Sequence, residues 1–278
     1  MTEIAPGEPL LSFKDVHISF DEGDILRGVS FDVRHGETQV LLGVSGSGKT
    51  VIMKLAAGLL RPDSGEIRVM GRDVGRMSEK ELLDFRRNIG FVFQEGALFD
   101  SLTVADNVCF RLRQERISDE EIESRVREAL RFVELESAID KFPAELSGGM
   151  RRRVSIARAL VDNPPVVFYD SPTAGLDPVT SQTIIVLIIR NRDLRNVTSL
   201  IATHRVQDAF GLANFRFDKA AGRVVPTGRN GSRAEAPPTK VLVLRNGEIY
   251  FEGAAEGLID SSDEYLKRFL VSAESFRV

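Results

Sequence analysis

The chain has 278 residues, of which 42% are hydrophobic and 28% charged, and a formal net charge of −4. This length and composition are those of a globular protein of one or two domains with a substantial core. The slightly negative charge excludes the global basic field with which proteins bind nucleic acid or anionic lipid without specificity. The single cysteine, Cys109, excludes an internal disulfide, is typical of a reducing compartment and is expected to be a small buried hydrophobic residue.

No segment of the sequence predicts a targeting or membrane-spanning element. The N-terminal decapeptide MTEIAPGEPL has neither a basic nor an apolar region, so we expect no signal peptide. The longest apolar span, residues 184–189, is far too short to cross a bilayer. Any role at a membrane is therefore expected to depend on a partner.

Residues 10–40 alternate between apolar and polar side chains, which predicts antiparallel strands with turns at 21–24 and 35–36. Phe20 lies just before the first turn. An aromatic side chain at this place either stacks on a base or packs in the core, and the pattern does not distinguish the two. Residues 38–42 then form a short apolar run.

A glycine-rich loop, GVSGSGKT at residues 43–50, follows this apolar run and precedes a helical segment at 51–60. The loop matches the pattern G-x-x-x-x-G-K-[ST], whose glycines let backbone N–H groups approach a phosphate at a helix N-terminus. Lys49 is expected to reach the β- and γ-phosphates, and Thr50 to offer its hydroxyl to Mg²⁺. The predicted nucleotide-binding residues are Gly43, Val44, Ser45, Gly46, Ser47, Gly48, Lys49, Thr50 and Val51.

The next elements predict an α/β chain with a helical insert. A turn at 61–66, a strand at 67–70, a helix at 78–85 and a strand at 89–93 lead to Gln94. Residues 102–140 are charged and helical by period, without a strand signal. Two glycines beside Ser147, namely Gly148 and Gly149, then begin a helix at 151–160 and offer a second anion site, although its arginine run is usually a solvated face.

The apolar run 166–170 reads as a central parallel strand that ends in Asp170, at the strand end where such sheets bind ligands. Asp170 is expected to serve Mg²⁺, directly or through water. After a helix at 181–190, the strand 198–203 ends at His204, which is either structural or a γ-phosphate contact. Residues 214–240 show little periodicity and are read as a mobile excursion, 241–253 as a hairpin, and 263–272 as a terminal helix.

The glycine loop, Gln94, LSGGM, VVFYD and His204 stand in a fixed order that resembles the ATP-binding subunit of ABC transporters over nearly the whole chain. The resemblance implies an α/β P-loop NTPase core with an antiparallel β subdomain and an inserted helical subdomain. It also implies a head-to-tail dimer that sandwiches two ATP molecules with Mg²⁺. The expected division is an ATPase domain at 10–253, including the helical subdomain at 94–160 and the flexible excursion at 214–240, and a C-terminal helical tail at 254–278.

Roles for single residues follow from the resemblance alone. Phe20 would stack on adenine, and Gln94 would sense Mg²⁺ and the attacking water and signal to the membrane subunit. Ser147, Gly148 and Gly149 would close on the γ-phosphate of the opposite subunit's ATP. The remaining roles are metal binding by Asp170, a dimer contact by the loop 174–177 with Asp177, and a switch function for His204.

A narrower resemblance rests on residues 93–108, FQEGALFDSLTVADNV, and on Met150, where most members carry Gln. These are similar to the ATPases of MCE-type bacterial lipid transporters, which move phospholipids, sterols or other hydrophobic molecules between envelope membranes. This resemblance implies an integral-membrane permease and an MCE substrate-binding protein as partners, and a peripheral location at the cytoplasmic face of the cell membrane. A soluble ABC protein that acts on ribosomes or DNA would usually carry two cassettes or a coiled-coil insert, and neither is present.

Two features depart from the family pattern. Ser171 follows Asp170 where the family has a glutamate that positions or activates water. Three interpretations follow: turnover is slow and Gln94 and His204 hold the water, a neighbouring group replaces the glutamate, or this chain pairs with a competent second ATPase. We favour ATP binding with weak or partner-dependent hydrolysis, and a non-hydrolysing subunit is the alternative. The excursion 214–240 is the second departure and is either a partner-binding loop or, as we favour, a neutral surface insertion.

Overall fold

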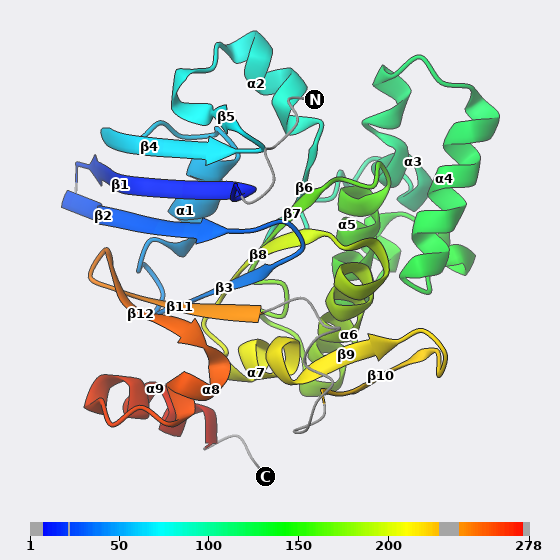
Figure 1. Ribbon diagram of the computed structural model, residues 1–278. Coiled ribbons are helices and arrows are strands. Elements are labelled where there is room, and N and C mark those ends of the chain that lie inside the picture. The colour runs from blue at the N-terminus through cyan, green and yellow to red at the C-terminus, as the bar shows by residue number, and fades with distance from the viewer. Residues whose placement is uncertain (1–7, 22, 228–238, 275–278) are drawn as a thin grey trace.

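The computed structural model describes residues 8–21, 23–227 and 239–274. Its centre is a six-stranded sheet in the order β12-β11-β3-β8-β7-β6 (Figure 1). The strands are β3 (Thr38–Leu42), β6 (Ile89–Val92), β7 (Val166–Asp170), β8 (Thr198–Thr203), β11 (Thr239–Arg245) and β12 (Glu248–Ala254). Every residue of β3, β7 and β8 is buried, as expected for parallel strands covered on both faces. Only β12 runs antiparallel to its neighbour.

An antiparallel sheet in the order β2-β1-β4-β5 covers one face of the core. It consists of β1 (Leu11–Phe20), β2 (Gly23–Val33), β4 (Ser64–Val69) and β5 (Arg72–Asp73). Its inward-facing residues include Phe13, which stacks on Phe31 with ring centroids 4.8 Å apart. The same hydrophobic cluster contains Ile52 and Met53 of α1 (Lys49–Ala56), so this sheet packs over the helix that follows the glycine loop.

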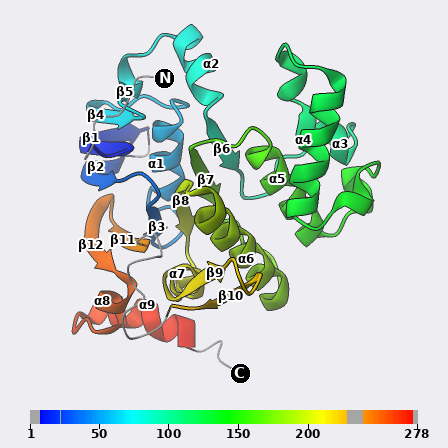
Figure 2. The ribbon, with the colours of Figure 1, turned by 45° about the vertical axis from the view of Figure 1, so that its right-hand side comes forward.

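The helices between β6 and β7 stand to one side of the central sheet, and α5 lies between that sheet and the outer helices α3 and α4 (Figure 2). Residues 93–165 are all described and contain no strand, in agreement with the predicted helical insert. The elements here are α3 (Val104–Cys109), α4 (Asp119–Phe132) and α5 (Gly148–Leu160), with 3-10 turns at Leu112–Gln114, Glu136–Ala138 and Pro143–Glu145. Each of the three α-helices begins with a Ser or Thr side chain that accepts a backbone N–H of the first turn.

Five more helices lie outside the helical insert among the described residues. They are α2 (Glu79–Arg86), which follows a 3-10 turn at Val74–Arg76, and α6 (Pro178–Arg195), α7 (Val206–Asn214), α8 (Ala255–Ile259) and α9 (Glu264–Glu274). The predicted terminal helix is α9, and α8 also lies within the predicted helical tail, whereas α7 was not predicted. Among the described residues, no helix combines the length and apolarity needed to cross a bilayer.

The prediction of a flexible excursion at 214–240 is corrected for the part that the structure describes. Strands β9 (Phe215–Asp218) and β10 (Arg223–Pro226) form an antiparallel hairpin that lies along α6. Strands of only four residues give too short a pattern to be recognised from periodicity. The last two residues of the predicted excursion, 239 and 240, begin β11, and residues 228–238 lie outside the described residues.

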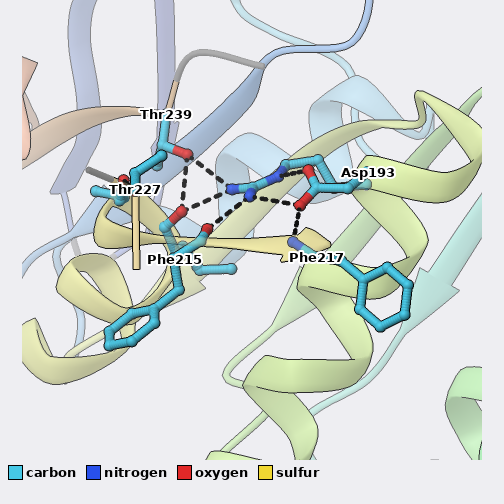
Figure 3. Close-up of polar contacts among 8 residues, drawn as sticks. Asp193, Phe215, Phe217, Thr227 and Thr239 are labelled. Atoms are coloured by element: carbon cyan, nitrogen blue, oxygen red, sulfur yellow. Dashed lines mark hydrogen bonds and ion pairs between the residues drawn. The ribbon is translucent and has the colours of Figure 1, made fainter. Parts of the chain in front are cut away.

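A buried ion pair on α6 fixes the start of this hairpin (Figure 3). The Arg192 side chain is 1% exposed, and its Nε donates to Oδ1 of Asp193 at 2.6 Å. The other carboxylate oxygen of Asp193 accepts the backbone N–H of Phe217 at 2.6 Å. The Arg192 guanidinium also donates to three oxygens: the carbonyls of Leu212 at 2.6 Å and Phe215 at 2.8 Å, and the hydroxyl of Thr239 at 3.2 Å. One cation therefore ties α6 to α7, β9 and β11.

We expect the substitution Arg192→Ala to lower the free energy of unfolding by about 3–5 kcal/mol, because it leaves the buried Asp193 carboxylate unpaired. Urea unfolding followed by circular dichroism measures this change. Arg268→Ala is the control, since Arg268 and Glu264 are 82% and 90% exposed and 4.0 Å apart. The control should change stability by less than about 1 kcal/mol. Equal effects of the two substitutions would contradict the role given to the buried pair.

Candidate functional site

The carboxyl ends of four neighbouring parallel strands bring the predicted site residues to one edge of the central sheet. Leu42 at the end of β3 pairs with Thr203 of β8, Asp170 of β7 pairs with Ala202, and Val92 of β6 pairs with Tyr169. The segments that follow these strands are therefore adjacent in space although they are far apart in the sequence. They carry the glycine loop, His204, Asp170 with Ser171, and Gln94.

The glycine loop folds around the amino group of Lys49. Lys49 Nζ donates to the carbonyls of Gly43 at 2.9 Å and Val44 at 2.8 Å, and to Ser47 Oγ at 3.3 Å. Gly48, with φ +99°, has no room for a side chain, since a Cβ would lie 2.7 Å from a methyl group of Leu26. Burial lowers the pKa of Lys49, and the Asp170 carboxylate opposes this shift. The loop thus holds a buried cation at the N-terminus of α1, where an anion is stabilised.

Thr50 and Asp170 are in direct contact. The Thr50 hydroxyl donates to both carboxylate oxygens of Asp170, at 3.1 Å and 3.0 Å, and the Asp170 residue is 6% exposed. A hydroxyl beside a carboxylate provides the hard oxygen ligands that Mg²⁺ prefers, so these residues fit the predicted metal. When bound, Mg²⁺ neutralises charge on the β- and γ-phosphates.

Ser171 has a left-handed backbone conformation, and its side chain carries no carboxylate. Its φ is +49°, in the left-handed region, and its N–H donates to the carbonyl of Ala202 at 2.9 Å. Its hydroxyl donates to Asp170 Oδ1 at 3.4 Å. The residue therefore lies beside the predicted metal ligand, yet it offers a neutral group in place of the family's glutamate.

Asp208 is a site-proximal residue that the sequence reasoning missed. Its buried carboxylate accepts the hydroxyl protons of Thr173 at 2.5 Å and Thr203 at 2.8 Å. Burial raises the pKa of Asp208, and these hydrogen bonds oppose the shift. The contacts join the loop after β7 to the residue before His204. The available signal was the apolar period of residues 206–214, which would have identified α7 and a carboxylate on its buried face.

The LSGGM residues form a second group, together with the loop 174–177. Ser147 Oγ accepts the N–H of Met150 at 3.2 Å and so begins α5. A Cβ on Gly149 would lie 2.4 Å from Thr180 Cγ2, so a side chain there would have to displace Thr180 where α5 meets the start of α6. Asp177 caps α6 by accepting the N–H of Thr180 at 3.0 Å. Hydrogen bonds from Thr180 lower the pKa of Asp177, which makes it a poor general base.

Three residues with predicted ligand roles have exposed side chains. Gln94 and His204 are exposed at the sheet edge, and Phe20 is 47% exposed at the end of β1. Direct hydrogen bonds join Lys49 to its loop, and Thr50 and Ser171 each to Asp170. The ligand roles of all these residues stay predictions.

Comparison with known proteins decides the family, because the profile described as "ABC transporter" matches residues 26–174. The chain belongs to the ABC transporter family. As a member, it is the ATP-binding subunit of an ABC transporter and an ATPase. Its fold is that of ABC cassettes, as the sequence predicted.

Curated relatives cover most of the chain. It is 37% identical to "Protein TRIGALACTOSYLDIACYLGLYCEROL 3, chloroplastic" of Arabidopsis thaliana, over 94% of this chain and 73% of the relative. It is 34% identical to the intermembrane phospholipid transport system ATP-binding protein MlaF of Haemophilus influenzae, over 84% and 89%. It is also 37% identical to the methionine import ATP-binding protein MetN of Rhizobium etli, over 85% and 66%.

Solved structures agree with this assignment. The dimeric ATP-binding cassette MJ0796 in a post-hydrolysis state with ADP and Pi matches with a TM-score of 0.74 and 29% identity, over 88% of this chain and 98% of that one. The cbiO1 protein of Clostridium perfringens, part of the ABC transporter complex cbiONQ, matches with a TM-score of 0.76 and 25% identity, over 98% and 96%.

The geometry of the loop predicts how a change at Lys49 affects nucleotide binding. In the wild-type chain, ATP with Mg²⁺ at 100 times the dissociation constant should raise the free energy of unfolding by about 2.7 kcal/mol. We expect Lys49→Ala to abolish this gain, because the loop loses its cation. Lys54→Ala, an exposed lysine on the same helix, should retain it. Thermal unfolding with and without MgATP measures both, and an undiminished gain in the Lys49 variant would contradict the assignment.

Proposed function

We propose that the chain is the ATPase of an MCE-type lipid transporter. The observation that carries this proposal is the similarity to MlaF over 89% of that protein's length, together with the run 93–108 and Met150. The similarity to the chloroplastic Arabidopsis protein adds weight. MetN, a methionine importer, is matched at comparable identity, so methionine is the competing substrate class.

The run that carries the resemblance, together with Phe110 just after it, also exposes aromatic side chains for a permease. Phe93, Phe99 and Phe110 are exposed, and the rings of Phe99 and Phe110 lie 4.6 Å apart. Buried Asn107 holds the loop beneath them, since its Oδ1 accepts the Phe99 N–H at 2.8 Å and its Nδ2 donates to the Phe99 carbonyl at 3.0 Å. Arg158 donates to the carbonyls of Gly96 and Ala97 from α5. A rigid aromatic surface of this kind suits docking of an integral-membrane subunit.

The proposed assembly is a head-to-tail dimer at the cytoplasmic face of the membrane, with the permease and an MCE substrate-binding protein. The LSGGM residues begin α5 whereas Lys49 begins α1, and in the proposed dimer Ser147, Gly148 and Gly149 would close on the partner's ATP. Asp177 would lie at the contact between subunits. The resemblance to a dimeric cassette bound to ADP and Pi also favours this arrangement.

Within that dimer, different residues of the chain bind the phosphates, the metal, the adenine and the attacking water. Lys49 and the loop N–H groups bind the β- and γ-phosphates, and Thr50 and Asp170 hold Mg²⁺. Phe20 stacks on adenine. Gln94 and His204 hold the attacking water. Ser171 cannot accept a proton from that water near neutral pH. Turnover is therefore slow or depends on the partner, and a subunit that only binds ATP is the alternative.

The test of this proposal is transport by the reconstituted complex. The chain, its permease and its MCE protein are placed in liposomes, and ATP-dependent movement of labelled phospholipid and of labelled methionine is measured. We expect phospholipid movement, no methionine movement, and loss of activity in a complex that carries Lys49→Ala. Movement of methionine alone, or lipid movement that is unchanged by Lys49→Ala, would overturn the proposal.

The missing glutamate generates a second prediction. Ser171→Glu should raise the rate of phosphate release by roughly 10²–10⁴-fold, because a carboxylate restores general-base assistance. Ser171→Gln is the matched control, since it has a similar size and the same left-handed backbone position but accepts no proton. The rates are compared on the purified full-length chain. Equal rates for the two variants would show that the carboxylate is not what limits turnover.

A further inference from the structure

The arginine run at the start of α5 contains one member that is buried. Arg152 is 6% exposed, whereas its neighbour Arg151 is exposed and Arg153 is intermediate. The Arg152 guanidinium donates through Nη1 to the carbonyl of Phe93 at 2.8 Å and through Nη2 to the carbonyl of Ala174 at 3.4 Å. A buried cation is retained only where such acceptors compensate its loss of water.

The two acceptors of Arg152 belong to the two loops that frame the site. Phe93 directly precedes Gln94, and Ala174 lies midway between Ser171 and Asp177. Arg152 itself lies on the helix that begins at Ser147. Because the guanidinium is planar and rigid, two hydrogen bonds from its two terminal nitrogens fix the separation of their acceptors. One side chain therefore connects the helix of the LSGGM group to the loops after β6 and β7.

The buried charge of Arg152 interacts with two carboxylates of the site. Burial lowers the pKa of Arg152, and the carboxylates of Asp170 and Glu95 oppose this shift. Asp170 ends β7, directly before the loop that carries Ala174, and Glu95 follows Gln94 in the loop after β6. Ser171 adds no negative charge, so the site beside Arg152 has one carboxylate fewer than the family pattern.

We propose that Arg152 is a positioning residue for ATP hydrolysis, which holds Gln94 and the Ser171–Asp177 loop in register with the helix that begins at Ser147. It acts through backbone carbonyls and touches no substrate. In a site without the glutamate, the attacking water is held mainly by Gln94. The rate of hydrolysis therefore depends on the hydrogen bonds of Arg152 that fix the position of Gln94. The inference rests on the proposed roles of Gln94 and Asp170.

The test compares Arg152→Gln and Arg152→Lys with Arg153→Gln in the full-length chain. Arg153 is the matched control, because it lies on the same helix but donates to Val133 and Glu134 in the helical subdomain. Single-turnover release of labelled phosphate measures slow rates, MgATP titration gives the affinity, and thermal midpoints check folding. We expect Arg152→Gln to lower the rate by about tenfold or more with an ATP affinity within about twofold of wild type, since a displaced group costs rate rather than binding.

Arg152→Lys should fall between the wild type and Arg152→Gln, because it keeps the charge but loses the fork. Arg153→Gln should match the wild type in rate. Unchanged release by Arg152→Gln, an equal loss in Arg153→Gln, or a wild-type chain that releases no phosphate would each overturn the inference. Failure of the proposed function is seen separately, as a wild-type chain that does not bind MgATP or a complex that moves no lipid.

Discussion

The contact between the Thr50 hydroxyl and the Asp170 carboxylate joins the first turn of α1 to the end of β7, across 120 positions of sequence. It forms because β3, β8 and β7 are parallel and in register, so that their carboxyl ends meet at one edge. Two hydrophobic layers bury those strands completely and hold the edge rigid. Metal binding, phosphate binding and the proposed coupling to a membrane partner all require this alignment.

Ser171 shows that the shape of this edge does not depend on the group that performs the chemistry. What fixes the residue is backbone: a left-handed φ and an N–H bound to the carbonyl of Ala202. A side chain at such a position can change while the turn around it stays the same. With serine at this position, the loop still surrounds Lys49 and Thr50 still contacts Asp170, so the proposed binding residues do not need the glutamate for their arrangement.

Most of the site was predictable because its signals are contiguous. The glycine loop and the apolar strand ending in Asp170 each depend on a few adjacent residues, and parallel topology then brings them together. The hairpin β9–β10 was not predictable, since its strands have only four residues each and its first residue, Phe215, is held by a buried arginine of α6. Asp208 was missed for a related reason, because its hydrogen bonds come from the hydroxyls of Thr203, at the end of β8, and Thr173, in the loop after β7.

The arginine run illustrates what local pattern reasoning overlooks. Consecutive residues of a helix point about 100° apart, so three adjacent arginines cannot share one solvated face. Arg152 lies in line with Ser155, Ile156 and Ala159, all of which are buried. The spacing thus already places one cation on the apolar face of α5. A cation there must be given acceptors from other segments, and in an α/β chain the loops at the carboxyl edge of the sheet provide them, which is why a residue of the helix reaches the site at all.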